Sequence, residues 1–306
     1  MLLALAFAIV LAASPAIGGS EKDRPPEDGK LRIIVFGAHP DDAELKAAGT
    51  AAMWAARGHH VKFVSITNGD LGHYEMSGGA LARRRLAEVQ EAARRLGITT
   101  EVMDIHDGEL MPSLENRRVM VRLIREWRAD VVMGHRPNDY HADHRNVGML
   151  MQDAAFMVTV PFYDLATPPV EPNPVFLFLY DTFRKPHPFE AHVIVDIGEG
   201  FQRKIDALDA LPSQFYETVY GVDPKTRKER LAAIPSDPAG RRAYAEVRFG
   251  AVAASVADRF RTELAERYGE ERARDVRYAE AFEICEYGRQ PTEEEIRKLF
   301  PFFPGK

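Results

Sequence analysis

The sequence predicts an α/β protein with a Rossmann-like, mainly parallel sheet, helices on both faces of that sheet and a helical C-terminal extension. From Leu31 to Leu211, short segments rich in β-branched and apolar residues alternate with longer segments of helical periodicity. Strands separated by helices of this length pair in parallel through right-handed crossovers, which place helices on both faces. After Gln214 the alternation stops, and charged, alanine-rich sequence begins.

Each element follows from its composition and from the glycines that interrupt it. The segment 31–38 has the apolar character of a buried strand, and the helical pattern after it ends at Gly58. Gly97 ends the second helical pattern in the same way. The other strands are expected at 61–67, 99–104, 130–135, 175–180 and 191–197. The helices are expected at 43–57, 80–96, 114–127, 147–160 and 199–211.

We place the main domain at residues 31–214 and a mainly helical extension, packed on that domain, at residues 215–306. Helical periodicity is present at 251–268, whereas 279–287 fits either a helix or a short strand. The many charges of the extension are typical of a solvated helix surface. Nothing in this part of the sequence indicates a function of its own.

Residues 1–18 have the character of a secretory signal peptide, and residues 19–30 have that of a linker. The run from Met1 to Ala16 is almost wholly apolar, and no charged side chain occurs before Glu21. The run is short for a transmembrane helix, which needs about 20 apolar residues. We therefore expect a periplasmic or secreted protein with no stable membrane span after cleavage. Because no Lys or Arg precedes the apolar run, an uncleaved anchor and a misplaced start codon stay open as alternatives.

The net charge and the cysteine content make some kinds of partner and of metal site improbable for this protein. A net charge of −6 and a pI near 6.0 give no reason to expect a nucleic-acid partner. The single cysteine, Cys285, excludes an intramolecular disulfide and a cysteine-based metal site. A homo-oligomer is compatible with this composition.

Two clusters of histidine and aspartate follow predicted strands. His39, Asp41 and Asp42 come directly after the strand at 31–38, and His141 and His144 follow the strand at 130–135. Ligands of open α/β sheets bind at the carboxyl ends of strands, so the two clusters can converge there. Taken separately, the carboxylates would suit a helix N-cap and the histidines an ordinary loop. Together they favour a metal site, because His and Asp are the ligand types of catalytic zinc.

The chain resembles the PIG-L/LmbE family of zinc-dependent N-acetylglucosaminyl deacetylases. The resemblance rests on the motif Ala-His-Pro-Asp-Asp-Ala-Glu at 38–44 and on His-Ala-Asp-His at 141–144. It extends over about residues 31–214. Ala142 stands where relatives often have proline, a difference that removes no metal ligand. Supporting matches are 67–73, Arg83-Arg84 with Glu88, Asp107-Gly108, 195–197 and 213–214.

The resemblance implies a role for each residue of the two motifs. One Zn²⁺ ion is expected to be bound by His39, Asp42 and His144, with other divalent metals as alternatives. Asp41 is then expected to be the general base. His141 is expected to stabilise the oxyanion and to protonate the leaving amine, with Asp143 orienting His141.

The resemblance also implies an amino-sugar substrate. Arg83 and Asp107 match family positions that hold sugar hydroxyls, although Arg83 would also suit a surface ion pair and Asp107 a simple turn. We expect hydrolysis of the N-acetyl group of a small or oligosaccharide N-acetylglucosamine-type substrate, with release of acetate. Two rivals stay open: a zinc amidase of the same fold that cleaves a non-sugar amide, and a non-catalytic carbohydrate-binding protein.

Overall fold

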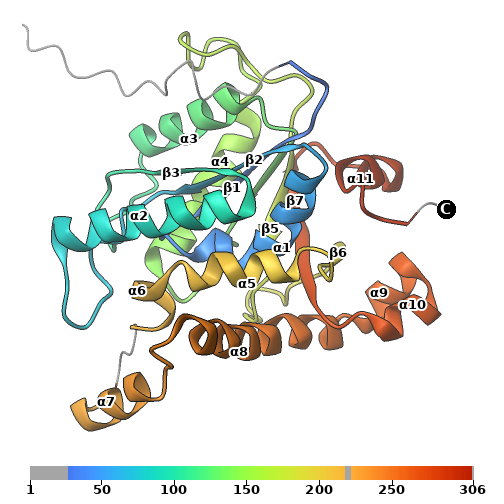
Figure 1. Ribbon diagram of the computed structural model, residues 1–306. Coiled ribbons are helices and arrows are strands. Elements are labelled where there is room, and N and C mark those ends of the chain that lie inside the picture. The colour runs from blue at the N-terminus through green and yellow to red at the C-terminus, as the bar shows by residue number, and fades with distance from the viewer. Residues whose placement is uncertain (1–26, 218–221, 305–306) are drawn as a thin grey trace, which may run out of the picture.

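The computed structural model describes residues 27–217 and 222–304 and places a seven-stranded sheet at the centre of the protein (Figure 1). The strands are β1 (Arg32–Gly37), β2 (His60–Ser65), β3 (Thr99–Val102), β4 (Val131–Gly134), β5 (Val175–Leu179), β6 (Val193–Asp196) and β7 (Ala279–Gly288). Their spatial order is β3-β2-β1-β4-β5-β7-β6. Strand β7 is antiparallel to both of its neighbours, whereas β1 to β5 pair in parallel.

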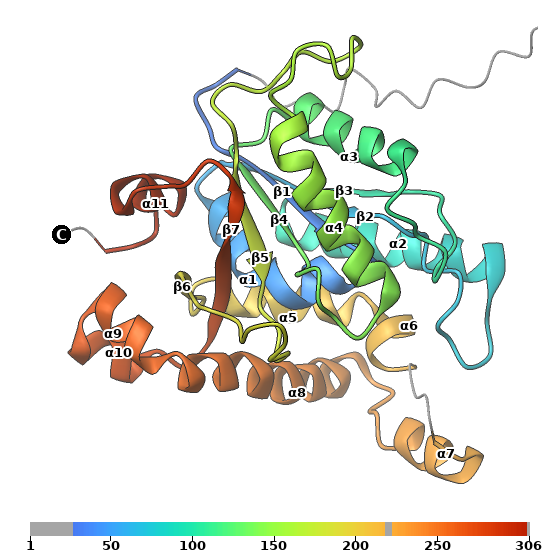
Figure 2. The ribbon, with the colours of Figure 1, turned by 180° about the vertical axis from the view of Figure 1, so that it is seen from behind.

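Helices cover both faces of the sheet, as the sequence predicts. The first five are α1 (Asp42–Ala56), α2 (Gly78–Leu96), α3 (Leu114–Trp127), α4 (Ala142–Met157) and α5 (Phe201–Asp209). Helices α1, α2 and α5 cover one face (Figure 1), and α3 and α4 cover the other (Figure 2). The alternation of side chains along β1 explains both cores: Ile33 and Val35 point into the first, and Ile34 and Phe36 into the second.

The C-terminal part does more than pack on the sheet. Residues 279–287, for which the sequence allowed a helix or a strand, lie within β7, which is inserted between β5 and β6. Its buried Glu280 accepts hydrogen bonds from Lys204 Nζ (2.6 Å) and from the Thr50 hydroxyl (2.6 Å). The sheet is therefore completed by the extension. The helices of this part are α6 (Pro212–Phe215), α7 (Pro224–Ala232), α8 (Pro238–Arg259), α9 (Arg261–Tyr268), α10 (Glu270–Asp275) and α11 (Glu293–Leu299).

The predicted signal peptide, residues 1–18, and most of the predicted linker lie outside the described residues. Among the helices of residues 27–217 and 222–304, none is long and apolar enough to cross a membrane.

The strand order explains why the two sequence clusters meet. The chain passes from β1 to β2 on one side and returns to β4 on the other side of β1. Strands β1 and β4 are neighbours in parallel register, with Ile33 opposite Val131. Their carboxyl ends therefore form a topological switch point, where open α/β sheets bind ligands.

Candidate metal centre and active site

The turn between β1 and α1 is shaped by the side chain of Asp42. Its Oδ2 atom accepts hydrogen bonds from the backbone amides of Ala38 (2.9 Å) and His39 (2.8 Å). A Cβ atom on Gly37 would lie 2.9 Å from the Asp42 Cβ, so a glycine is needed for this close approach. The turn thereby engages Oδ2 with the backbone and leaves Oδ1 as the carboxylate oxygen available to a ligand.

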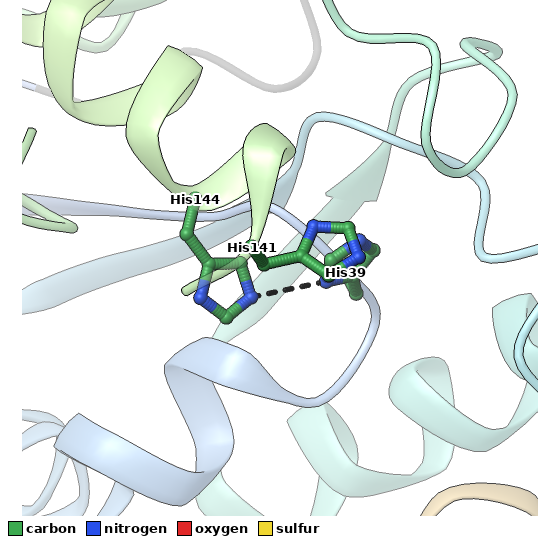
Figure 3. A group of neighbouring side chains, drawn as sticks. All are labelled: His39, His141 and His144. Atoms are coloured by element: carbon green, nitrogen blue, oxygen red, sulfur yellow. Dashed lines mark hydrogen bonds between the residues drawn. The ribbon is translucent and has the colours of Figure 1, made fainter. Parts of the chain in front are cut away.

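The other cluster is fixed by the start of α4. His141 is the N-cap residue of this helix, and its Nδ1 accepts a hydrogen bond from the Asp143 backbone amide (3.2 Å). His144 follows one helical turn later, so both rings project to the same side. Figure 3 shows these two rings beside His39, which comes from the turn before α1, with a dashed line joining His39 to His144.

The side chains of three residues lie at about the spacing of a tetrahedral metal site. His39 Nδ1 lies 3.2 Å from His144 Nε2. The Asp42 carboxylate lies 3.4 Å from His144 Nε2 through Oδ1 and 3.5 Å from His39 Nδ1 through Oδ2. Zinc bonds of about 2.0–2.1 Å at tetrahedral angles require ligand atoms about 3.4 Å apart. His39, Asp42 and His144 could therefore hold a zinc-type ion, with Asp42 contacting the two histidines through different carboxylate oxygens.

Each of the two ligand histidines has a carboxylate at its other nitrogen. His39 Nε2 lies 3.0 Å from Asp107 Oδ1 and 3.2 Å from Asp143 Oδ2. His144 Nδ1 lies 3.1 Å from Asp139 Oδ1. Such contacts fix the tautomer that turns the free lone pair towards a metal. Asp139 is not among the residues predicted from the sequence.

The side chain of Asp143 contacts a different residue from the one expected. It was expected to orient His141, but its carboxylate contacts His39 and accepts hydrogen bonds from the backbone amides of Gly108 (2.7 Å) and Leu110 (3.3 Å). His141 is held by the Asp143 backbone amide instead. This arrangement follows from the start of α4. The ring of the N-cap residue His141 accepts a hydrogen bond from the Asp143 backbone N–H, and the Asp143 side chain points inward and is fully buried.

The electrostatics of this cluster suit a cation. Burial lowers the pKa of His39, but the carboxylates of Asp107, Asp143 and Asp42 more than offset it and raise that pKa above its ordinary value. Buried carboxylates in such numbers are stable only when positive charge compensates them. A divalent ion between His39, Asp42 and His144 would provide that charge.

His135 is a further member of the cluster that the sequence analysis missed. Its Nε2 lies 3.2 Å from Asp42 Oδ2, and its ring stacks on the His144 ring with a centroid separation of 4.1 Å. Burial lowers the pKa of His135 to about 4, so the ring is neutral near pH 7. Its position at the end of β4, beside the second motif, is the signal that could have identified it.

Two further titratable groups, Asp41 and His141, line the same cavity as His39, Asp42 and His144. Asp41 lines the central cavity, and burial, followed by the adjacent Asp42 charge, raises its pKa to about 7. Burial, followed by repulsion from His39 and His144, lowers the pKa of His141. Because Nδ1 of His141 accepts a backbone N–H, its neutral ring carries the proton on Nε2 and can donate from there.

The cavity has a volume of about 390 Å³ and a wall rich in polar groups. Asp107 lines it, as the substrate-binding prediction requires, but Arg83 does not; Arg83 is exposed on α2, and Arg85 lines the cavity in its place. The correction follows from helix geometry, because residues two apart point roughly 200° from each other. The lining also includes Gln214 and Tyr140, a residue that is 74% exposed.

Arg85 builds one wall of the cavity by holding the loop after β2. Its guanidinium donates hydrogen bonds to the carbonyls of Gly69 (2.6 Å), Leu71 (2.9 Å) and Gly72 (2.8 Å), and to Gln214 Oε1 (2.7 Å). Gly69 has φ +66°, and a Cβ there would lie 2.9 Å from the Arg85 side chain. The loop therefore takes its shape from a buried arginine that is remote in sequence.

Comparison with known proteins agrees with this geometry. Residues 34–155 match the sequence model of the PIG-L family, described as GlcNAc-PI de-N-acetylase. The diacetylchitobiose deacetylase of Thermococcus kodakarensis is 28% identical over 207 residues, which cover 65% of this chain and 76% of that protein. The N,N'-diacetylchitobiose deacetylase from Pyrococcus horikoshii, solved with an inhibitor, has a similar fold, with a TM-score of 0.62, 23% identity and 83% coverage of each chain.

The fold is shared with a protein named for a different reaction. The 4-carboxy-2-hydroxymuconate hydratase from Pseudomonas putida has a TM-score of 0.64 and 19% identity, with coverage of 86% of this chain and 99% of that one. A shared fold fixes architecture and leaves the reaction to the site. The architecture, the two motifs and the sequence match coincide: residues 34–155 of this chain match the PIG-L family and contain both motifs.

Proposed function

We propose that this protein is a zinc-dependent hydrolase that removes the N-acetyl group from an N-acetylglucosamine-type amino sugar or conjugate. The observation that carries the proposal is the convergence of His39 Nδ1, His144 Nε2 and Asp42 within 3.2–3.5 Å of one another, beside Asp41 and His141. The relatives named as deacetylases of diacetylchitobiose support the substrate class.

The metal would be held by His39, Asp42 and His144. When bound, zinc supplies Lewis-acid polarisation of the amide carbonyl and lowers the pKa of water in the open coordination position. The Asp107 and Asp143 carboxylates at His39, and Asp139 at His144, hold the two imidazoles in the orientation that such an ion needs.

The protein's own residues then divide the proton transfers. Asp41 accepts a proton from the attacking water, because its carboxylate lines the cavity beside the ligand atoms. His141 Nε2–H donates a hydrogen bond to the carbonyl oxygen as negative charge develops there, and its proton can pass to the leaving amine. Both contributions act on charge that appears only in the transition state, which is the condition for acceleration.

The sugar is expected in the polar part of the cavity. Asp107 and Gln214 offer oxygen and nitrogen atoms for its hydroxyls, and the loop that contains Leu71 and Gly72 forms the opposite wall. Asp107 would serve both the substrate and His39. This double contact predicts that substrate binding and metal binding are coupled at Asp107.

The test is acetate release by the purified protein from a panel of N-acetylglucosamine compounds, with zinc and with chelator. Asp41→Asn should keep the metal and lose about 10²–10⁴-fold in kcat, and His141→Ala should lose about 10²–10³-fold. Full activity of a metal-loaded Asp41→Ala protein would exclude the base assignment. Tight sugar binding without turnover would favour the carbohydrate-binding protein, and turnover of non-sugar amides alone would favour the amidase.

We further propose that the protein is exported. This proposal rests on the apolar run of residues 1–18 alone. Cell fractionation followed by N-terminal sequencing tests it: a mature protein that begins after the run supports export, and a cytosolic protein that retains the run refutes it.

A further inference from the structure

A second cavity opens from the same reacting centre and has no role in the mechanism above. Its volume is about 350 Å³, and it shares Asp41, Asp42, Tyr140 and His144 with the first cavity. Its remaining wall comes from α1, Asp139, α5, the segment after β5, helix α8 and strand β7. Two cavities therefore meet at the atoms that would carry the chemistry.

The two cavities differ in character. The first is bordered by Arg85, Asp107 and Gln214, which suit sugar hydroxyls. The wall of the second includes several apolar and aromatic side chains: Tyr180, Phe183, Val252, Ala253, Val256 and Ala281. Apolar side chains of this kind bind hydrocarbon groups by excluding water, and they offer no hydrogen-bond partner to a sugar hydroxyl.

The charged side chains in the wall of the second cavity are already compensated by neighbouring charges. Lys204 Nζ contacts Glu280 at 2.6 Å, and Asp181 Oδ1 contacts the Arg136 guanidinium at 3.3 Å. Lys46 lies near enough to Asp139 and Asp181 to stabilise their negative charges. An anionic ligand would meet these carboxylates and those of Asp41 and Asp42, so the cavity favours an uncharged, apolar occupant.

Amide geometry identifies the part of the substrate that can reach this cavity. A secondary amide is planar and trans, so the groups on nitrogen and on the carbonyl carbon extend in opposite directions. With the sugar in the polar cavity, the acyl chain points away from it across the cleaved bond. An aglycone, in contrast, extends from the sugar and stays on the sugar's side.

We propose that the second cavity binds the acyl chain of an N-acyl amino sugar, so that this protein removes acyl groups longer than acetyl. The proposal rests on the proposed hydrolase function and extends its substrate class. Water adds to the carbonyl carbon and the C–N bond breaks. The products are a short-chain carboxylate and the free amine, and no oxidant or reductant takes part.

The first experiment compares N-acetyl-, N-butanoyl- and N-hexanoylglucosamine as substrates. Each methylene buried in the apolar wall should raise kcat/KM roughly fourfold, until the cavity is filled. Val252→Trp should block the chain, because Val252 lines the cavity and its 50% exposure allows the larger side chain without disturbing the core. The matched control is Val247→Trp on the same helix, since Val247 is 77% exposed and lies outside this cavity.

The expected result is a loss of at least about tenfold in kcat/KM for the hexanoyl substrate in Val252→Trp, given the 10–200-fold range for groups in apolar pockets. The kcat/KM for the acetyl substrate should change less than about twofold in Val252→Trp, because a surface substitution away from the acetyl group has only a small effect. Val247→Trp should match the wild type with both substrates. Melting temperatures check that both variants are folded.

A binding measurement separates this proposal from the proposed function. Calorimetry with the zinc-loaded protein compares acetate with hexanoate, the two carboxylate products. Hexanoate should bind more tightly than acetate to the wild type and to Val247→Trp, but not to Val252→Trp. This comparison needs no turnover and depends only on the second cavity.

Several outcomes overturn the proposal. Cleavage of the acetyl but not the butanoyl substrate would leave the proposed function intact and remove the acyl-chain assignment. An effect of Val252→Trp confined to N-acetylglucosaminides with an apolar aglycone would assign the cavity to the aglycone instead. Absence of cleavage with every N-acyl glucosamine would refute the proposed hydrolase function. Equal affinity for acetate and hexanoate would separately refute the assignment of the second cavity to the acyl chain.

Discussion

The metal cluster and the loop wall border the same cavity but are held together in different ways. The metal cluster, defined as His39, Asp42 and His144, is organised by contacts within two short motifs and by adjacent carboxylates. The loop wall, residues 69–72, takes its shape from Arg85 on α2 and Gln214 on α6. The cluster therefore depends on charge and local turns, whereas the wall depends on hydrogen bonds between remote segments.

This difference predicts that substitutions in the two regions impair different properties of the protein. Loss of a ligand should abolish metal binding while the fold persists, because the sheet and both hydrophobic cores are built from other residues. Loss of the wall's anchor should weaken substrate binding and stability while the metal remains. Variants that mix the two outcomes would show that the two regions are coupled.

The largest effect is expected for His144→Ala. Its Nε2 is one of the three proposed ligand atoms, and an aspartate and a histidine alone do not make a zinc site. Zinc content should fall below stoichiometric levels, and acetate release should fall at least about 10³-fold, since the metal supplies several kcal/mol of transition-state stabilisation. His60→Ala is the matched control, because His60 pairs with Asp28 at the surface. Full zinc content in His144→Ala would remove His144 from the ligand set.

A smaller effect is expected for Asp143→Asn. The amide keeps the shape but removes the charge beside His39 Nε2, and changes to such partners weaken metal affinity about 10–100-fold. Titration with a competing chelator measures that affinity. Asp139→Asn at His144 should behave alike. A changed pH profile with unchanged metal affinity would instead support the sequence-based role of Asp143 at His141.

The third effect falls on the loop wall. Arg85→Lys replaces a planar fork that makes four hydrogen bonds with a single ammonium group, so loop carbonyls lose their donors. The free energy of unfolding should fall by about 2–3 kcal/mol, and KM should rise more than kcat falls. Arg83→Lys is the matched control, because Arg83 is exposed two residues away on the same helix. Equal effects of the two substitutions would refute the assignment of Arg85 to the loop wall.

The same difference explains what the sequence could predict. Helix and strand periodicity predicted the α/β class, and the motifs at 38–44 and 141–144 predicted the residues that the structure brings together as His39, Asp41, Asp42, His141 and His144. Each of these lies next to a strand end, where position follows from local sequence. Their convergence required only the parallel pairing of β1 with β4.

The remaining features depend on contacts that a single sequence does not display. Arg83, Arg84 and Arg85 are chemically identical neighbours, and only the rotation of α2 decides that the third faces the loop. Asp143 could have turned to either histidine, and the packing of Gly108 and Leu110 against its carboxylate decides the outcome. Strand β7 joins the sheet through pairing with β5 and β6, about a hundred residues away in the case of β5.

The smallest effect is expected at the outer edge of the loop wall. Arg84 pairs with Glu217 at 2.6 Å, and Glu217 also contacts His73 at 2.9 Å, but the arginine and glutamate side chains are each about 30% exposed. Water and salt screen an ion pair of this kind, so Glu217→Gln, which leaves the pair between Arg84 and the buried Glu88 (3.0 Å) in place, should lower the free energy of unfolding by less than about 1 kcal/mol. Urea denaturation at low salt measures the loss, which should shrink in 1 M NaCl as screening removes the attraction in the native protein. If the free energy of unfolding fell as much as in Arg85→Lys and the loss did not depend on salt, the exposed ion pair would stabilise the loop wall as strongly as the buried Arg85 does.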